Sequence, residues 1–153
     1  MKLLKSISIF LIINFGALAL GVILMNNGPL TTWYTNLNKA PWSPPNWMFG
    51  FAWTLIMICY SIYLAYLFNE VSNLKLKILY IIQLVLNVSW SYVFFNLHLI
   101  SAGLIVIIAL TFVVVLFLIL YFKTLKLKSV LILPYLLWLC IATSLNAYIY
   151  FNN

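Results

Sequence analysis

Five long apolar runs dominate this sequence and limit the folds that are open to it. They cover about residues 6–25, 47–68, 78–95, 99–122 and 130–151, and each contains 18 to 24 residues. A helix needs roughly 20 mainly apolar residues to cross the hydrocarbon core of a bilayer. The runs are continuously apolar rather than alternating, which disfavours a transmembrane barrel. We therefore predict an all-α membrane protein, one domain of residues 1–153 that forms a bundle of five transmembrane helices.

The composition excludes the soluble alternatives. Hydrophobic residues make up 67% of the 153 residues, charged residues only 6%, and the mean hydropathy is +1.15. A soluble domain usually carries about a quarter of charged residues. So few charges could not cover a surface that faces water. The same composition also excludes a disordered chain and a disulfide-stapled secreted scaffold.

Acidic and metal-binding residues are scarce, and this limits the chemistry. Glu70 is the only carboxylate side chain and His98 the only histidine. Catalysis by paired carboxylates is therefore excluded. Cys59 and Cys140 fall near the middle of separate apolar runs, so we expect neither a disulfide nor a metal centre. No ordinary catalytic residue is predicted.

The lysines predict the orientation in the membrane. If all five runs cross the bilayer, only Lys39 falls on one side, and seven lysines fall on the other: Lys2, Lys5, Lys75, Lys77, Lys123, Lys126 and Lys128. Basic residues concentrate on the cytoplasmic side of membrane proteins. We therefore expect a multi-pass protein of a bacterial-type cell membrane, with the N-terminus in the cytoplasm and the C-terminus outside.

The link between the first two runs, residues 26–46, is rich in aromatic residues and proline. Four aromatic residues and three prolines fall within the 15 residues from 33 to 47. Trp and Tyr favour the headgroup level, so this segment could be an interfacial aromatic belt. Pro44-Pro45 also stiffens the chain before the second run, and a stiff aromatic loop could close over a cavity as a lid. The residues alone leave both interpretations open.

Three of the five predicted helices carry a stripe of aromatic or polar residues at helical spacing. The stripes are Phe49, Trp53, Met57 and Tyr60; Gln83, Asn87 and Ser91 with Trp90 and Phe94 beside them; and Tyr135, Trp138, Ala142 and Asn146. Amides at bilayer depth need partners, so these faces should point into the protein. They could act only as contacts between helices. Alternatively, they could enclose a flat apolar ligand by stacking, with the polar groups fixing its orientation.

The other two helices show simpler patterns. In the first, Asn14 should bond to a neighbouring helix, and Ala17 and Gly21 permit close helix packing. The fourth is almost purely aliphatic, and we expect it to face lipid or another subunit. Pro134 should lie in the first turn of the fifth helix, where its missing donor costs little.

Three sequence blocks resemble the TspO/MBR family, the tryptophan-rich sensory proteins that include the mitochondrial translocator protein. The blocks lie in the family's order and extend over nearly the whole chain: Trp33-Tyr34-x-x-Leu37-x-Lys39, Trp42-x-Pro44-Pro45 and Phe49-Gly50-x-x-Trp53-Thr54; Leu86-Asn87-x-x-Trp90-Ser91 with Phe94-Phe95; and Pro134-Tyr135-x-x-Trp138 with Ala142-Thr143-x-Leu145-Asn146. The resemblance implies five tilted helices, usually in a dimer, with a cavity closed by the loop after the first helix.

The resemblance also implies a ligand and a pocket. The ligands would be porphyrins such as protoporphyrin IX and haem, without a required cofactor and without nucleic acid. Carried onto this chain, the pocket comprises Tyr34, Trp42, Pro44, Trp53, Asn87, Trp90, Trp138, Ala142, Leu145 and Asn146. The chain departs from the family at Lys39-Ala40-Pro41-Trp42, where the proline is displaced by one position. It also lacks a basic residue after the tyrosines near its end, so sterol binding is doubtful.

The resemblance leaves three functions open. The first is a membrane receptor that binds tetrapyrroles in porphyrin homeostasis or stress signalling. The second is an enzyme that degrades bound porphyrin with light and oxygen, in which Trp53 and Trp138 would be the redox-active side chains. The third is transport of porphyrin or lipid.

Overall fold

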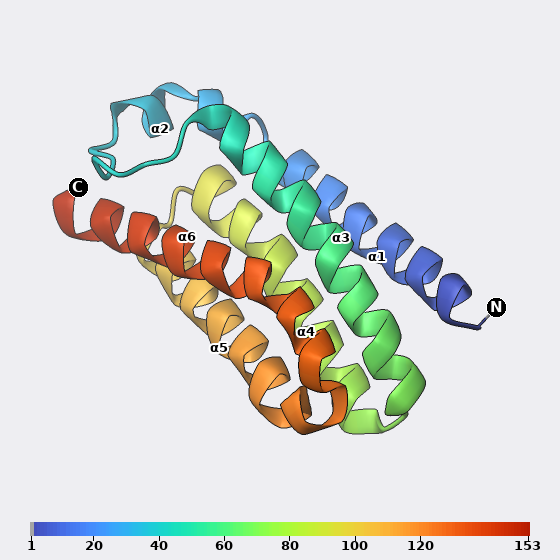
Figure 1. The fold of residues 1–153 in the computed structure, drawn as a ribbon. Coiled ribbons are helices and arrows are strands. Elements are labelled where there is room, and N and C mark those ends of the chain that lie inside the picture. Colours follow the sequence, from blue (N-terminus) through green and yellow to red (C-terminus); the bar gives the residue numbers. More distant parts are fainter. Residues whose placement is uncertain (1) are drawn as a thin grey trace.

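The computed structural model describes residues 2–153, which fold into helices without any β-strand (Figure 1). Five helices are long: α1 (Lys2–Leu24), α3 (Asn46–Glu70), α4 (Leu74–Ser91), α5 (Ile100–Leu125) and α6 (Leu133–Asn152). Four short elements connect them: the 3₁₀ turn η1 (Gly28–Leu30), α2 (Thr32–Asn36), the π-helical turn η2 (Tyr92–Asn96) and the 3₁₀ segment η3 (Lys126–Ile132). The predicted all-helical class is confirmed.

Four continuous helical segments are long and apolar enough to cross a membrane. They are Lys2–Leu30, Asn46–Glu70, Leu74–Asn96 and Ile100–Asn152. The last segment has 53 residues, about twice the length of a spanning helix, because η3 joins α5 to α6 without a break. The chain turns back at η3, so α5 and α6 run side by side as two helices (Figure 1). The fold is that of an integral membrane protein.

The five long helices are arranged in a ring. α1 packs on α3 and α4, α3 packs on α6, and α5 packs on both α4 and α6; α3 also contacts α5 across the ring. The order around the bundle is therefore α1, α3, α6, α5, α4. α2 and the C-terminus lie at one end of this bundle. The N-terminus and the α3–α4 and α5–α6 turns lie at the other end (Figure 1).

Local sequence signals set several of the helix ends. The Asn73 side chain accepts a hydrogen bond from the Leu76 amide at 2.8 Å and caps α4. Pro134 lies in the first turn of α6 as predicted, where a helix has no use for its missing amide proton. α3 begins directly after Pro44-Pro45, with Pro45 in an extended conformation.

Some helix boundaries differ from the predicted ones. The link 26–46, expected to be irregular, contains η1 and the five-residue helix α2. The third run was predicted to end as regular helix at residue 95, yet the chain widens into the π-turn η2 from Tyr92. The fifth run was predicted to begin at residue 130, whereas α6 begins at Leu133 after η3.

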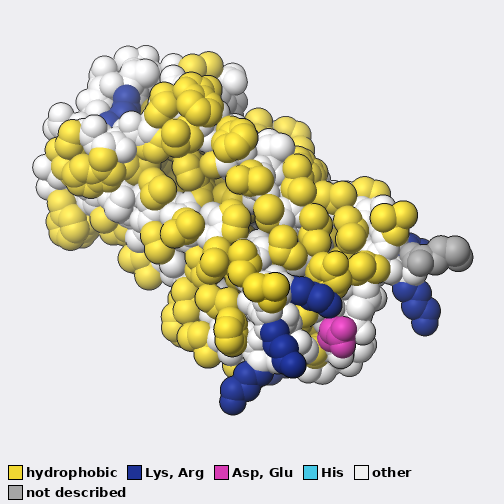
Figure 2. All heavy atoms as spheres, viewed as in Figure 1, with side chains coloured by type: hydrophobic (Ala, Val, Ile, Leu, Met, Phe, Trp, Pro, Cys, Tyr) yellow, Lys and Arg dark blue, Asp and Glu magenta, His cyan; other side chains and the backbone are white. Residues whose placement is uncertain are grey.

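The fourth predicted helix, α5, is more buried than expected. One face packs inside the bundle through residues such as Leu110, Val114 and Phe117, while Ile105 and Phe112 remain exposed on the opposite face. Because nearly all residues of α5 are aliphatic, their types do not distinguish the buried face from the exposed one. The expectation that this helix faces lipid is therefore correct for one side only. Apolar side chains also cover most of the bundle surface visible in Figure 2.

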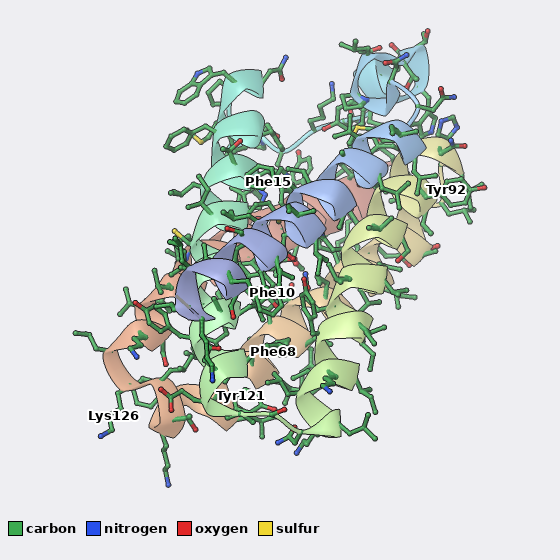
Figure 3. The ribbon with its side chains drawn as sticks, turned by 90° about the vertical axis from the view of Figure 1, so that its right-hand side faces the viewer. Phe10, Phe15, Phe68, Tyr92, Tyr121 and Lys126 are labelled. Carbon is green, nitrogen blue, oxygen red and sulfur yellow. The ribbon has the colours of Figure 1, made fainter. Side chains whose placement is uncertain are left out.

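The predicted polar and small residues of α1 lie against neighbouring helices. The Asn14 amide nitrogen donates to Ser61 Oγ of α3, and its oxygen accepts from the Tyr80 hydroxyl of α4, both at 2.9 Å. Gly21 is buried, and a Cβ at that position would lie 3.2 Å from Ser91 Oγ on α4. Phe10 further joins α1 to α3 through Phe68, with ring centroids 4.9 Å apart (Figure 3). The predictions for Asn14 and Gly21 are therefore confirmed.

Candidate functional site

One face of α6 forms the centre of the candidate site. It presents five residues that are all buried: Tyr135, Trp138, Ala142, Leu145 and Asn146. Their spacing of three and four residues places them on a single side of the helix. This side points toward α3 and α4, so the predicted stripe on the fifth helix faces the interior.

Aromatic rings join α3 to this face. The Phe49 and Trp138 rings meet edge to face with centroids 5.3 Å apart. One turn along α3, the Trp53 and Tyr135 rings meet in the same manner at 6.2 Å. Phe49 and Trp53 are only half-buried, which leaves part of each ring accessible. The α3 stripe and the α6 stripe therefore form one aromatic contact.

Polar contacts join α4 to the same face. The Trp90 indole nitrogen donates a hydrogen bond of 3.4 Å to the Asn146 side-chain oxygen. The Asn146 amide nitrogen donates to the Ala142 carbonyl of its own helix at 2.9 Å. The Trp90 ring also stacks on Phe94, with centroids 5.7 Å apart and an interplanar angle of 10°. Trp90 thus connects η2 with α6.

A three-residue hydrogen-bond chain crosses the bundle deeper inside. Gln83 Nε2 donates to the Tyr135 hydroxyl at 2.9 Å, and this hydroxyl donates to Asn87 Oδ1 at 3.2 Å. Gln83 Oε1 is buried without a partner in the described part of the chain. α4 and α6 lie across the ring from each other, so long side chains rather than backbone packing connect them here. Side chains that can rotate therefore fill the space between α4 and α6.

The loop after α1 covers the end of the bundle nearest these residues. Tyr34, on α2, packs edge to face against Phe95, with centroids 5.2 Å apart. Lys39 Nζ lies 4.9 Å from the centre of the Tyr34 ring. Burial raises the pKa of Tyr34 above its ordinary value. Its hydroxyl is therefore a neutral donor near a lysine, a combination suited to a carboxylate.

Two sets of contacts hold this loop in place. At the C-terminal end of the bundle, the Asn38 amide nitrogen donates to the Asn153 side chain at 2.9 Å, and Asn38 Nδ2 donates to the Asn152 carbonyl at 3.0 Å. At the other edge, Trp33 stacks on His98 with centroids 4.1 Å apart. A Cβ at Gly28 would overlap the Phe95 side chain, so only glycine allows η1 to approach η2 this closely. The link therefore folds onto the bundle rather than extending along the membrane surface.

Trp42 and Pro44 stand apart from the other predicted pocket residues. Trp42 is exposed; its indole nitrogen donates to Ser144 Oγ at 3.2 Å and its ring contacts Tyr148. Ser144 lies on the side of α6 opposite Asn146, because two residues on a helix are separated by about 200°. Pro44 is half-buried in the extended segment before α3. Of the other eight predicted residues, seven lie on the inward face of α6 or contact it, and Tyr34 contacts η2.

The chemistry of this site is that of stacking and hydrogen bonding. In residues 2–153 no group of three or more His, Cys, Asp and Glu side chains could hold a metal ion. The site offers indole and phenol rings, two asparagine amides and a nearby lysine. These features define the class: a helical membrane protein with an aromatic site between helices beneath a folded loop.

Comparison with known proteins identifies the family. The TspO/MBR family matches residues 9–151. The chain is 40% identical over 124 residues to the tryptophan-rich protein TspO of Archaeoglobus fulgidus, with 80% of each chain covered. It is 31% identical to protein CrtK of Rhodobacter capsulatus, with 74% of each chain covered. It is 29% identical to the translocator protein of Homo sapiens, over 79% of this chain and 75% of that protein. The chain belongs to the TspO/MBR family, which confirms the resemblance.

Several residues that support the site were absent from the predicted pocket. Tyr135 and Gln83 belong to the predicted stripes, but their mutual hydrogen bond depends on the rotation of two separate helices. Asn38 holds the loop through contacts with the end of the chain, more than 100 residues away. The Trp33–His98 stack needs the left-handed backbone of His98, with φ of 56°. No local sequence pattern indicates either of these last two contacts.

Proposed function

We propose that this chain is a membrane receptor for tetrapyrroles such as protoporphyrin IX and haem and for similar flat hydrophobic ligands, with a role in porphyrin homeostasis or stress signalling. The observation that carries the proposal is that Trp53 of α3 and Trp90 of α4 both contact the inward face of α6, which also carries Trp138. Large aromatic faces with a few fixed polar groups suit a flat apolar ligand. The names of relatives such as the tryptophan-rich sensory protein and the translocator protein agree with a receptor or carrier role in those proteins.

The proposed binding mode follows from the positions of the polar groups. The ligand ring lies between the tryptophan faces, and Asn87 and Asn146 offer amides to its edge. Carboxylates of the ligand point toward the loop, where Tyr34 donates a hydrogen bond and Lys39 supplies charge. The Phe49–Trp138 contact separates on entry, and the Trp90–Asn146 bond, already long at 3.4 Å, opens with it.

Binding is tested by titrating the purified protein with protoporphyrin IX and following the Soret band of the porphyrin. We expect the double variant Trp53→Ala/Trp138→Ala to lose affinity by roughly tenfold or more, because stacking on an aromatic ring is worth about 1–3 kcal/mol. Trp47→Ala is the matched control, since Trp47 is exposed on the outside of α3. An unchanged affinity in the double variant would contradict the stacking role.

The proposed topology has all five long helices crossing the bilayer of a bacterial-type cell membrane, with the N-terminus in the cytoplasm. It rests on the lysines at the ends of α1, α4 and α5, which gather at one end of the bundle (Figure 2). Reporter fusions at both termini test it. A C-terminal reporter that is active in the cytoplasm would rule out five spans.

Two other activities of the same site are separable by experiment. Porphyrin degradation would use the half-buried Trp53, whose ring touches the oxidisable Tyr135. It would produce a new absorbance under light and oxygen that Trp53→Phe abolishes. Transport would instead produce ligand flux into proteoliposomes.

A homodimer, expected from the family resemblance, is tested by the mass of the purified protein in detergent.

A further inference from the structure

A groove lies at the end of the bundle opposite the loop, between the end of α5 and η3. It has a volume of about 630 Å³ and is lined by Phe122, Lys123, Lys126, Leu127 and Val130. The three apolar side chains are all exposed, and 84% of Leu127 is accessible. In a membrane protein, exposed apolar side chains such as these are covered by another apolar surface. Two lysines therefore border an apolar surface at one edge of the bundle.

The backbone at this corner brings the two lysines to the same groove. Lys126 follows the last turn of α5 and has a φ of 50°, which ends the helix and redirects the chain into η3. Figure 3 shows Lys126 at the extreme lower end of the molecule, far from Tyr92 at the other end. By contrast, Lys128 is engaged elsewhere, because its Nζ lies 4.2 Å from the centre of the Tyr66 ring. Lys123 and Lys126 are therefore the cations of this groove.

The chain cannot neutralise these cations. Seven lysines belong to this end of the bundle, and Glu70 is the only carboxylate side chain in the sequence. The lysines at this end therefore exceed the carboxylate side chains by six positive charges. A second groove, about 390 Å³ in volume, combines one lysine with four aliphatic residues: Leu74, Lys75, Ile78, Leu79 and Ile82. The pairing of lysine with exposed aliphatic side chains thus occurs twice at this end.

We propose that the groove between α5 and η3 is a binding site for one anionic phospholipid. The lipid phosphate lies between Lys123 and Lys126, and its acyl chains cover Phe122, Leu127 and Val130. A lipid with net negative charge matches both features of the groove, since basic pockets at the membrane edge attract such headgroups. A free phosphate would match the lysines but leave the apolar lining uncovered. The site lies at the opposite end from the aromatic site and does not depend on porphyrin binding.

The test counts lipids bound to the full chain by native mass spectrometry in a neutral detergent. The probes are dioleoylphosphatidylglycerol, dioleoylphosphatidylcholine and the soluble headgroup glycerol 3-phosphate. We expect Lys123→Gln/Lys126→Gln to weaken phosphatidylglycerol binding by roughly tenfold or more, because each lysine near a lipid phosphate contributes measurably to affinity. Lys2→Gln/Lys5→Gln removes the same charge from the same end and should change it less than about twofold. Lys123→Arg/Lys126→Arg should retain binding.

Leu127→Gln tests the apolar half of the site, and it should lower phosphatidylglycerol affinity without changing the charge. Equal losses in both lysine-to-glutamine pairs would mean diffuse attraction to a basic surface and would overturn the proposal. Equal affinity for phosphatidylcholine in the unmodified chain would also overturn it. Competition by glycerol 3-phosphate as effective as that of the lipid would identify a soluble phosphate site instead. Lys123 and Lys126 are both exposed, so we expect their variants to keep the melting temperature of the unmodified chain. An unchanged melting temperature excludes unfolding as the cause of weaker lipid binding.

Discussion

The Tyr135 hydroxyl connects α6 to α4 on the opposite side of the ring, and removing it gives a quantitative test of the structure. This hydroxyl accepts from Gln83 at 2.9 Å and donates to Asn87 at 3.2 Å. In Tyr135→Phe both bonds disappear. Gln83 then has no hydrogen bond left, because its Oε1 already lacks a partner among the described residues. The ring contacts with Trp53 remain, since phenylalanine keeps the same shape.

The expected magnitude follows from these two bonds. Hydrogen bonds between helices of a membrane protein contribute on average about 0.6 kcal/mol each and at most about 1.7 kcal/mol. Tyr135→Phe should therefore lower the free energy of unfolding by about 1 kcal/mol, with an upper bound of about 3 kcal/mol. Reversible unfolding of the protein in mixed micelles with increasing denaturing detergent, followed by tryptophan fluorescence, measures this difference.

A second variant shows whether the loss arises from the proposed contact. Gln83→Leu alone removes an amide that is only half satisfied and leaves the Tyr135–Asn87 bond in place. In the double variant Tyr135→Phe/Gln83→Leu, the unpaired Gln83 amide is gone, and only Asn87 has lost its partner. Its cost should be smaller than the sum of the single costs by about 0.5 kcal/mol or more. Costs that add within about 0.3 kcal/mol would show that the hydroxyl and the amide do not interact, and would refute this geometry.

Three further predictions concern the core and the loop. Tyr60→Phe should leave the stability unchanged or raise it by up to about 1 kcal/mol in the same unfolding assay, because the Tyr60 hydroxyl is buried without a partner in the described chain; a large loss would reveal an unseen bond. Gly103→Ala should destabilise the protein by about 1–3 kcal/mol, because a Cβ there would lie 2.9 Å from Phe94 Cδ2. Gly16→Ala is its matched control, with nothing within 4 Å of the added Cβ, and an equal loss in both would contradict the close α5–η2 contact. Asn38→Ala should speed porphyrin dissociation in stopped-flow measurements, because it removes the bond from Asn38 Nδ2 to the Asn152 carbonyl that helps to hold the loop on the end of α6. Asn36→Ala, also exposed, should not change the rate, and equal rates in both variants would show that this loop contact does not limit ligand release.

The interior of this fold was largely predictable from sequence, because the membrane makes polar residues easy to interpret. Amides at bilayer depth need partners, so Gln83, Asn87 and Ser91 were expected to face protein, and all three are buried. Asn14 was expected to bond to another helix for the same reason, and it bonds to two. In each case one physical requirement, the satisfaction of a polar group away from water, was enough to orient a helix.

The loop and the helix junctions were less predictable, because contacts between distant segments determine them. α2 is only five residues long, below the length at which a helix forms without tertiary support. Its support comes from Phe94 and Phe95, which lie about 60 residues further along the chain. Trp42 was expected in the pocket with the other tryptophans. Its position instead depends on which side of α6 the loop descends, and no residue pattern determines that path.

The side-chain contacts between α4 and α6 explain how a rigid fold could still admit a ligand. Neighbouring helices in the ring are packed directly, and α1 and α4 approach closely at Gly21. The opposed pair α4 and α6 is joined through the side chains of Gln83, Tyr135, Asn87, Trp90 and Asn146. Rotating side chains costs far less than separating packed helices, because backbone packing buries much more surface. Ligand entry should therefore move Trp90 and the loop while the ring of helices stays intact, so porphyrin should alter hydrogen exchange in α2 and η2 before it alters exchange in α1.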